Sequence, residues 1–242
     1  MLENNWEDYY NTYREKPHCF TTPVDDAPVI SKMFSRLNIA VEDATSALST
    51  LVVGVGGSKA IREYSKLFWE EISSQEDLDT LVFLDIRNFD SEDKVTLESF
   101  KGEALLIRAD GTTLPFEDHS FNLVLTHCLF ECLSDEQLKK VIREIDRVTM
   151  NQGLGIHTFA DSGNIERFFQ RSMNRLNKKR FGIDFNYRGE KDIEELLSRN
   201  NFNLVDRGMV GSGFRECQNL TIGCVKGAPS SNRKSMRAPF IV

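Results

Sequence analysis

The sequence ADGTTLPFEDHSFNLV, residues 109–124, joins two short apolar runs of the chain. These runs, at 104–109 and 122–126, each predict a buried β-strand. Working outward in both directions, similar runs occur at 51–53, 81–85, 155–159, 202–207 and 220–226. The sequence therefore predicts a sheet of seven strands.

Helical patterns separate most of these strands. Residues 59–73 place apolar side chains on one helical face, and residues 135–149 predict a second helix with Ser134 as its N-cap. Further helices are expected at 164–180 and 191–199. Strands that alternate with helices, and that are continuously apolar, are typical of a parallel sheet covered on both faces. We therefore predict an α/β protein with a mostly parallel sheet and helices on both faces.

The two ends of the chain differ from this central region. Residues 1–48 contain no strand signal but include aromatic residues at helical spacing, so we expect an N-terminal helical cap. Residues 49–226 are expected to form the main domain. Residues 227–242 predict a flexible basic tail.

The composition limits the classes of protein that fit. A chain of 242 residues is long enough for one α/β domain with a small appendage. No apolar run approaches the ~20 residues that span a bilayer, and the polar N-terminus lacks the apolar core of a signal peptide. The five cysteines lack CxxC spacing, which argues against a disulfide framework or a zinc site and favours a reducing cytoplasm. The net charge of −7 disfavours a general nucleic-acid binder.

The stretch LVVGVGGS, residues 51–58, leads from a strand through three glycines into a helix. Glycine lets a ligand approach the main chain, and a helix N-terminus offers unpaired N–H groups to an anionic or carboxylate-bearing nucleotide. The loop matches neither GxGxxG nor the phosphate-binding pattern GxxxxGK[ST], so a simple packing turn stays an alternative. Asp85 ends the next strand, where an acid typically binds ribose hydroxyls, although it follows Gly54 by 31 residues rather than about 20.

Residues 109–124 and the helix after them resemble the class I, Rossmann-like S-adenosylmethionine-dependent methyltransferases. The nearest branch contains the ubiquinone/menaquinone methyltransferases and many small-molecule methyltransferases. Its pattern resembles D-A-x-x-L-P-F-x-D-x-S-F-D-x-V, followed by a helix that ends R-E-x-x-R-V-L-K-P-G-G. The matching residues are Asp110, Leu114, Pro115, Phe116, Asp118, Ser120, Phe121, Val124, Arg143, Glu144, Arg147, Val148 and Gly153.

The resemblance implies S-adenosylmethionine as cofactor, S-adenosylhomocysteine as product, and a site across the carboxyl ends of the strands. Gly54 and Gly56 would let the methionine portion lie against the main chain. Asp85 would accept hydrogen bonds from both ribose hydroxyls, since a carboxylate suits a pair of donors. Thr126 and His127 would border the methionine portion and the transferable methyl group.

The same resemblance places the adenine near the next strand ends. Ile86 would pack on the ring, and Asp110 would accept a hydrogen bond from its amino group. The main-chain N–H of Gly111 would lie near a ring nitrogen.

Several positions depart from the family pattern. Val52 stands where an acid often helps to hold the cofactor's ammonium group, and Ser58 replaces the third glycine. Asn122 and the Asn-Gln-Gly turn at 151–153 also differ from the pattern. These departures leave open a methyltransferase-like protein that serves as a binding or scaffold subunit.

Methyl transfer from a sulfonium is an in-line displacement that mainly needs alignment and the exclusion of water. Where the acceptor must lose a proton, His127 is the candidate base, with Glu131 orienting it or acting itself. A polar pocket-wall residue is an equal interpretation of His127. His157 lies inside an expected strand and is interpreted as a core histidine. No metal ligands are expected.

The acceptor side of the site is expected to involve the insert at 163–190 and the N-terminal helices, which often cover the pocket in this family. Arg167 and Arg171 belong to a basic helical stripe that would attract an anionic acceptor, although we favour a solvated helix face. Tyr9 and Tyr13 would close the pocket from the other side, or simply pack the cap on the sheet.

We therefore predict a cytoplasmic S-adenosylmethionine-dependent methyltransferase that acts on a small molecule through O, N or C. The chief alternative is a methyltransferase-like binding or scaffold protein. A nicotinamide-dependent dehydrogenase fits less well, because the glycine loop lacks its fingerprint. An RNA methyltransferase is disfavoured by the acidic total charge.

Overall fold

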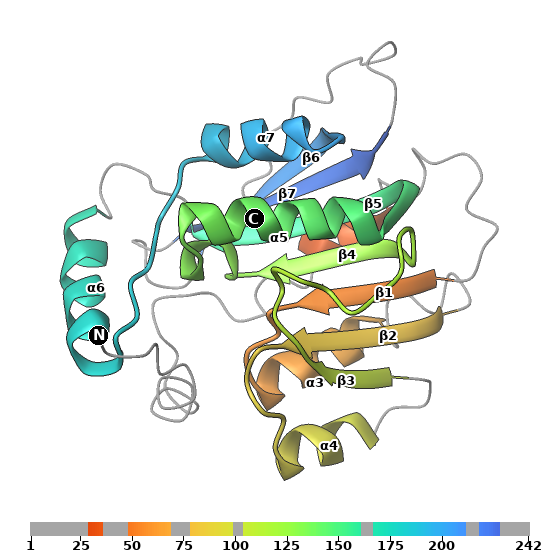
Figure 1. Cartoon of the computed structure of the whole chain (residues 1–242), viewed down its shortest axis with the longest axis horizontal. Helices are drawn as coiled ribbons and strands as arrows, with labels where there is room; N and C mark the ends of the chain where they lie inside the picture. Colours follow the sequence, from red (N-terminus) through yellow and green to blue (C-terminus); the bar gives the residue numbers. More distant parts are fainter. Residues whose placement is uncertain are drawn as a thin grey trace.

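The computed structural model of the chain describes residues 29–35, 48–68, 78–98, 104–160, 167–211 and 218–227; for 78, 79, 167–173, 210, 211 and 218 it describes the backbone alone. One seven-stranded sheet lies at the centre, in the order β3-β2-β1-β4-β5-β7-β6 (Figure 1). Strand β7 runs antiparallel to both of its neighbours, β5 and β6, and the other neighbouring strands of this sheet pair in parallel. The strands are β1 (Leu48–Val53), β2 (Leu78–Asp85), β3 (Ala104–Arg108), β4 (Phe121–His127), β5 (Thr149–Ala160), β6 (Phe202–Gly211) and β7 (Gln218–Lys226). The predicted mostly parallel, seven-stranded sheet is confirmed.

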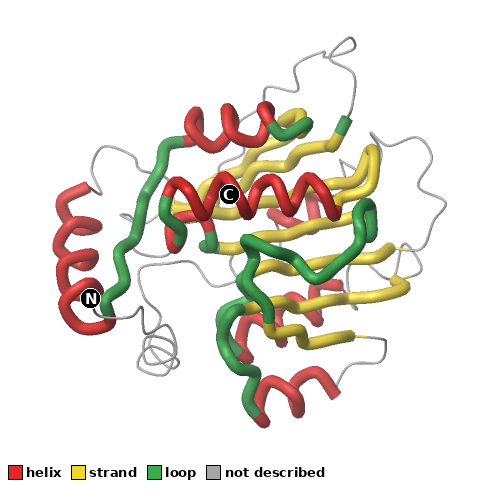
Figure 2. The backbone as a smooth tube through the Cα atoms, viewed as in Figure 1, coloured by secondary structure: helices red, strands yellow, loops and turns green. Residues whose placement is uncertain are grey.

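Helices cover both faces of the sheet, as predicted. Helices α5 and α7 lie over one face and α3 over the other (Figure 2). Helix α6 stands beyond the edge at which β1, β2 and β4 end (Figure 1). The helices of the main domain are α3 (Ser58–Lys66), α4 (Ser91–Glu98), the short 3-10 helix η2 (Phe130–Cys132), α5 (Asp135–Val148), α6 (Arg167–Phe181) and α7 (Glu190–Arg199).

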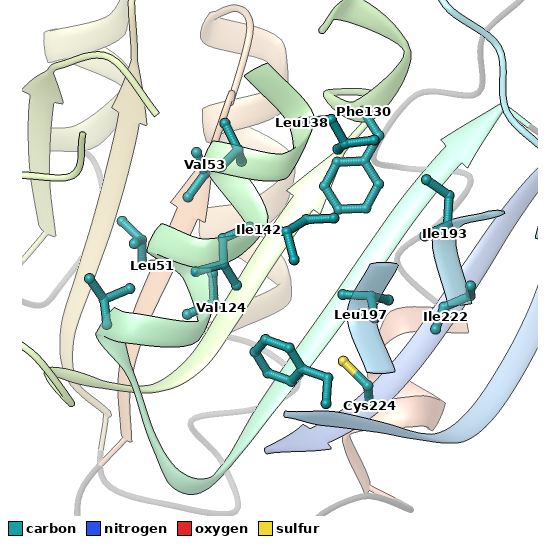
Figure 3. Packing of buried hydrophobic residues seen from close by; sticks show 14 of the residues in the cluster. Leu51, Val53, Val124, Phe130, Leu138, Ile142, Ile193, Leu197, Ile222 and Cys224 are labelled. Carbon is teal, nitrogen blue, oxygen red and sulfur yellow. The ribbon is translucent and has the colours of Figure 1, made fainter. Parts of the chain in front are cut away.

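The continuous apolar strands are explained by burial on both sides. Leu51 and Val53 of β1 pack in the cluster that contains Ile142 of α5 (Figure 3). Val52, between them, points to the opposite face and joins the cluster that contains Ile61 of α3. Because successive strand residues face opposite sides, a doubly covered strand needs apolar residues at every position.

Part of the expected N-terminal cap is described. Residues 29–35 are helical. Ile30, Met33 and Phe34 join the cluster on the α3 face. Residues 1–28, which include Tyr9 and Tyr13, and residues 228–242 of the expected tail lie outside the described residues.

Helix α4 is an element that the sequence analysis did not identify. Asp90 caps it, because its Oδ1 accepts hydrogen bonds from the N–H groups of Glu92 and Asp93 at 2.9 and 3.0 Å. Its Val95 is 65 % exposed, so the helix carries little of the apolar periodicity by which the others are recognised. Within the described residues, no helix is both long and apolar enough to cross a membrane.

Candidate cofactor and catalytic site

The loop after β1 is fastened to the end of β2. Gly54 and Gly56 have φ values of +73° and +79°, which glycine adopts readily and other residues rarely do. The N–H of Gly54 donates to the carbonyl oxygen of Leu84 at 2.8 Å. The N–H of Gly56 donates to Oδ2 of Asp85 at 2.8 Å. Two predicted parts of the site, the glycine loop and the acid at the end of β2, are therefore in direct contact.

The two ends of the glycine loop have different surroundings. A Cβ atom at Gly54 would lie 2.8 Å from Cδ1 of Leu129, so the turn after β4 occupies the space beside this glycine. A Cβ atom at Gly57 would have no described atom within 4 Å. Packing therefore accounts for Gly54, while the open side at Gly57, the N-cap of α3, leaves room for a ligand to approach the main chain.

Asp85 combines deep burial with strong main-chain hydrogen bonds. It is 4 % exposed, and its Oδ1 accepts from the N–H of Arg87 at 3.0 Å. Burial raises the pKa of Asp85, while the N–H groups and the charge of Arg87 oppose that rise. Each carboxylate oxygen has two lone pairs, so Asp85 keeps acceptor capacity for a ribose diol.

Arg87 is a site residue that the sequence analysis did not identify. Its Nε donates to the carbonyl oxygen of Gly56. Its Nη1 and Nη2 donate to the two carboxylate oxygens of Asp93 in α4, at 2.7 and 3.0 Å. Asp93 is 1 % exposed, so the pair is a buried brace between the glycine loop and α4. Arg87 and Gly56 are 31 residues apart in the sequence, and no local pattern around Arg87 predicts their contact.

The residues expected to hold the adenine lie at neighbouring strand ends. Ile86 is 54 % exposed beside Asp85 and offers an apolar surface on which a ring can pack. Asp110 is exposed after β3, the strand that pairs with β2, and its Oδ1 accepts from the N–H of Thr112 at 2.8 Å. A Cβ atom at Gly111 would lie 3.4 Å from Val53, an ordinary contact, so space does not demand glycine there.

Five of the residues that match the family pattern hold the β3–β4 connection onto α5: Leu114, Phe116, Asp118, Glu144 and Arg147. Arg147 donates to the carbonyl oxygens of Leu114 and Phe116 at 2.9 and 2.7 Å. It also donates to Oδ1 of Asp118 at 2.9 Å. Glu144 accepts from the N–H of Leu114 at 2.7 Å and pairs with Arg147 at 2.8 Å, which lowers the pKa of Glu144. These contacts hold the loop that carries Asp110 onto α5.

The end of β4 places two polar residues in different surroundings. Thr126 is 2 % exposed, and its Oγ1 lies 3.0 Å from Nδ1 of His157 in β5. Burial lowers the pKa of His157 to about 3, so this imidazole is neutral, and the prediction of a core histidine is confirmed. His127 is partly exposed, with its ring centroid 6.3 Å from that of Tyr64 in an edge-on arrangement.

Glu131 lies in η2, one turn after His127, and is 2 % exposed. Burial raises the pKa of its carboxyl, while the nearby His127 and Cys128 oppose that rise. Its carbonyl oxygen accepts from the N–H of Asn186 at 2.6 Å. The predicted pair of His127 and Glu131 is therefore brought together in one turn, with His127 nearer to solvent.

The predicted acceptor residues are described less fully. Arg167 and Arg171 belong to the first half of α6, and their side chains lie outside the described part of the structure. Tyr9 and Tyr13 lie outside the described residues altogether. Arg175 and Lys179, further along α6, are exposed. Within the described residues, no group of three His, Cys, Asp or Glu side chains could hold a metal ion.

The sheet order, the reversed β7 and the loops at the carboxyl edge define the Rossmann-like methyltransferase fold. Residues 51–156 match the family model described as "Methyltransferase domain". The matched region runs from β1 into β5 and contains the glycine loop, both strand-end acids and the turn that carries Glu131. No curated protein matches the sequence.

Solved structures share this fold at low sequence identity. Magnesium protoporphyrin IX methyltransferase from Synechocystis, with bound S-adenosylhomocysteine, is 14 % identical with a TM-score of 0.60, over 91 % of this chain and 93 % of that chain. The 1,6-didemethyltoxoflavin-N1-methyltransferase of Burkholderia thailandensis is 10 % identical with a TM-score of 0.59, over 92 % of this chain and 87 % of that chain. A SAM-dependent methyltransferase from Methanosarcina mazei is 15 % identical with a TM-score of 0.55, over 78 % and 96 %. At these identities the likeness shows the fold.

Proposed function

We propose that the chain is an S-adenosylmethionine-dependent methyltransferase that acts on a small-molecule acceptor. The observation that carries the proposal is the hydrogen bond of Asp85 to the N–H of Gly56, within the region that matches the family model. This hydrogen bond joins the buried acid at the end of β2, which is proposed to bind the ribose diol, to a glycine loop that opens at a helix N-terminus. The finer assignment to the ubiquinone/menaquinone branch rests on the sequence pattern at 109–124 and 143–153. A reducing cytoplasm, inferred from the cysteines, belongs to the same proposal.

The cofactor would lie across the ends of β1, β2 and β3. Asp85 would accept the ribose hydroxyls, and Ile86 would support the adenine. Asp110, held by the turn at Thr112, would accept from the adenine amino group. Gly54, Gly56 and Thr126 would border the methionine portion, and Gly111 the ring nitrogen. When bound, S-adenosylmethionine supplies an electrophilic methyl group on a sulfonium.

The chain's own part in the reaction is to align the acceptor and to exclude water. His127, partly exposed at the end of β4, would take a proton from an acceptor that must lose one. Glu131, buried one turn later, would orient His127 or act itself. An acceptor that attacks without losing a proton would need neither.

The acceptor is proposed to enter beside α6, with Tyr9, Tyr13, Arg167 and Arg171 on its path. The carbonyl of Phe185, in the segment after α6, accepts from Nδ2 of Asn174 at 2.9 Å, and the next residue contacts the turn of Glu131. The exposed cations of α6 favour an anionic acceptor. Two of the structural neighbours are named for small-molecule substrates, which supports the same substrate class.

Calorimetric titration with S-adenosylmethionine and S-adenosylhomocysteine tests the cofactor proposal. We expect micromolar binding that Asp85→Ala abolishes. Because Asp85→Ala also removes the acceptor of the Gly56 N–H, Asp110→Asn serves as a second variant: it keeps Oδ1 for Thr112 while losing the charge. We expect Asp110→Asn to bind about tenfold more weakly, as for the loss of one charged hydrogen bond.

The control is Asp184→Asn, which removes an exposed charge paired with Lys178 on the surface of α6. It should bind both ligands as the wild type does. If folded wild-type protein binds neither ligand, the enzyme proposal is wrong and the scaffold interpretation takes its place. The buried Val52 on β1, where the family often has an acid, is the observation that favours that second candidate.

A further inference from the structure

The carboxylate of Glu131 is buried without a hydrogen-bond partner. The residue is 2 % exposed, and neither Oε1 nor Oε2 has a partner among the described residues. A buried carboxylate without a partner costs several kcal/mol of folding free energy, so such groups generally have a functional explanation. The guanidinium of Arg188 is close to the same turn but donates to carbonyl oxygens and to Asp135 instead.

The turn that carries Glu131 lies against the glycine loop. Leu129, two residues earlier, occupies the space beside Gly54. Strands β1 and β4 are neighbours in the sheet, with Val53 opposite Thr126. Burial raises the pKa of the Cys132 thiol, and the charges of Glu131 and Asp85 add to that rise. Glu131 is therefore at the methionine side of the proposed cofactor site.

The turn is also held in place. Arg188 donates to the carbonyl oxygen of Phe130 at 2.7 Å and to that of Leu133 at 2.8 Å. Asn186 donates its main-chain N–H to the carbonyl oxygen of Glu131 itself at 2.6 Å. The main chain of the turn is therefore held by hydrogen bonds at Glu131 and on both sides of it.

The other acids of the site already have partners or lie elsewhere. Asp85 accepts main-chain N–H groups on both oxygens. Asp110 is exposed after β3. On β1, the buried Val52 stands at the position where the family often has an acid. Among the described residues of the site, Glu131 is thus the buried carboxylate whose two oxygens have no hydrogen-bond partner, and the partly exposed His127 lies near it.

We propose that Glu131 is the counter-charge for the cationic part of the cofactor, its ammonium or its sulfonium. The proposal rests on the proposed function and deepens it. It assigns to the turn after β4 a binding task in addition to any contact with the acceptor. A cation that enters the site satisfies the carboxylate, and the fixed turn means that little order must be gained on binding.

The test compares Glu131→Gln with the wild type by calorimetry against three ligands. S-Adenosylmethionine carries an ammonium and a sulfonium, S-adenosylhomocysteine carries the ammonium alone, and 5′-methylthioadenosine carries neither. We expect the substitution to weaken S-adenosylmethionine at least about tenfold and to leave 5′-methylthioadenosine within about twofold. Equal loss for S-adenosylhomocysteine assigns the ammonium, and a loss confined to S-adenosylmethionine assigns the sulfonium.

Glu136→Gln, an exposed change of the same charge on α5, is the matched control and should bind all three ligands normally. Thermal unfolding without ligand should show Glu131→Gln at least as stable as the wild type, because a buried charge is removed. Glu131→Met, of similar volume, gives the same comparison if the amide variant folds poorly. Unchanged affinity for S-adenosylmethionine in a folded variant overturns the proposal. Wild-type protein that binds none of the three ligands overturns the proposed function instead.

Discussion

His157 is a histidine held neutral inside the sheet. Its ring centroid lies 5.3 Å from that of Phe130, and a Cβ atom at Gly155 would come within 2.7 Å of its Nε2. Its pKa is about 3 in the folded protein, against 6.5 for an ordinary histidine. Below pH 6.5 the imidazole of His157 is protonated in the unfolded chain but stays neutral in the folded protein until the pH approaches 3. The stability contributed by this residue is therefore complete above pH 6.5 and is lost as the pH falls toward 3.

The wild type should lose about 1.4 kcal/mol of unfolding free energy per pH unit between pH 6 and 4 through His157 alone. His157→Asn keeps a polar atom for Thr126 but removes this titration. Urea unfolding across that range should give a flatter pH dependence for the variant, even though lost packing makes it less stable overall. Parallel curves for the two proteins would contradict the buried neutral state.

Gly54 combines a positive φ with close packing, so we expect Gly54→Ala to lower the unfolding free energy by about 1–2 kcal/mol. Gly57→Ala is the matched control, because a Cβ atom there meets no described atom within 4 Å. Alanine is a poorer N-cap than glycine, which destabilises the fold, but it also lowers the entropy of the unfolded chain, which stabilises the fold. These two effects roughly cancel, so the unfolding free energy of Gly57→Ala should stay within about 0.5 kcal/mol of the wild type. Equal destabilisation of both variants in chemical unfolding would show that Leu129 does not pack on Gly54.

At the scale of elements, Arg147 joins α5 to the β3–β4 connection through a planar fork of donors. Arg147→Lys keeps the charge but cannot reach Leu114, Phe116 and Asp118 together. We expect a loss of about 1–3 kcal/mol in unfolding free energy. Arg143→Lys, an exposed change on the same helix, should cost less than about 0.5 kcal/mol. Similar losses for both variants would mean that the clamp contributes nothing measurable.

The strands could be predicted from sequence because burial on both faces leaves continuous apolar runs, as at Leu51–Val53. Helix α5 could be predicted because Ser134 caps it, accepting from the N–H of Gln137 at 3.3 Å, and its apolar residues face the sheet. Helix α4 escaped prediction because it is stabilised by the cap at Asp90 and leaves Val95 exposed. Local patterns reveal elements that bury an apolar face, and α4 does not.

The site was only partly predictable for a related reason. The strand-end positions of Asp85, Asp110 and His127 follow from the fold, since parallel strands end at one edge. Arg87 donates to Asp93 in α4, and Arg188 donates to the turn that carries Glu131. Both contacts join segments that a local sequence pattern does not connect. Such contacts leave no spacing in the sequence, so they emerge only from the structure.

At the scale of the whole molecule, the proposed cofactor site connects the two halves of the sheet. Asp85 and Asp110 lie on the β2–β3 side, while Thr126 and Glu131 lie on the β4 side. A ligand that contacts both sides should stabilise the fold as a unit, by about 2.7 kcal/mol at one hundred times its Kd. For a domain of this size that corresponds to a rise in Tm of roughly 5–10 °C.

Thermal unfolding with S-adenosylhomocysteine checks this expectation. The wild type should show the full shift and Asp110→Asn a smaller one at the same ligand concentration. Asp184→Asn should shift as the wild type does, because Asp184 is exposed and its charge pairs with Lys178 of α6. A ligand that binds by calorimetry yet shifts Tm no further in the wild type than in Asp110→Asn would bind elsewhere. The carboxyl edge of the sheet would then not be the site.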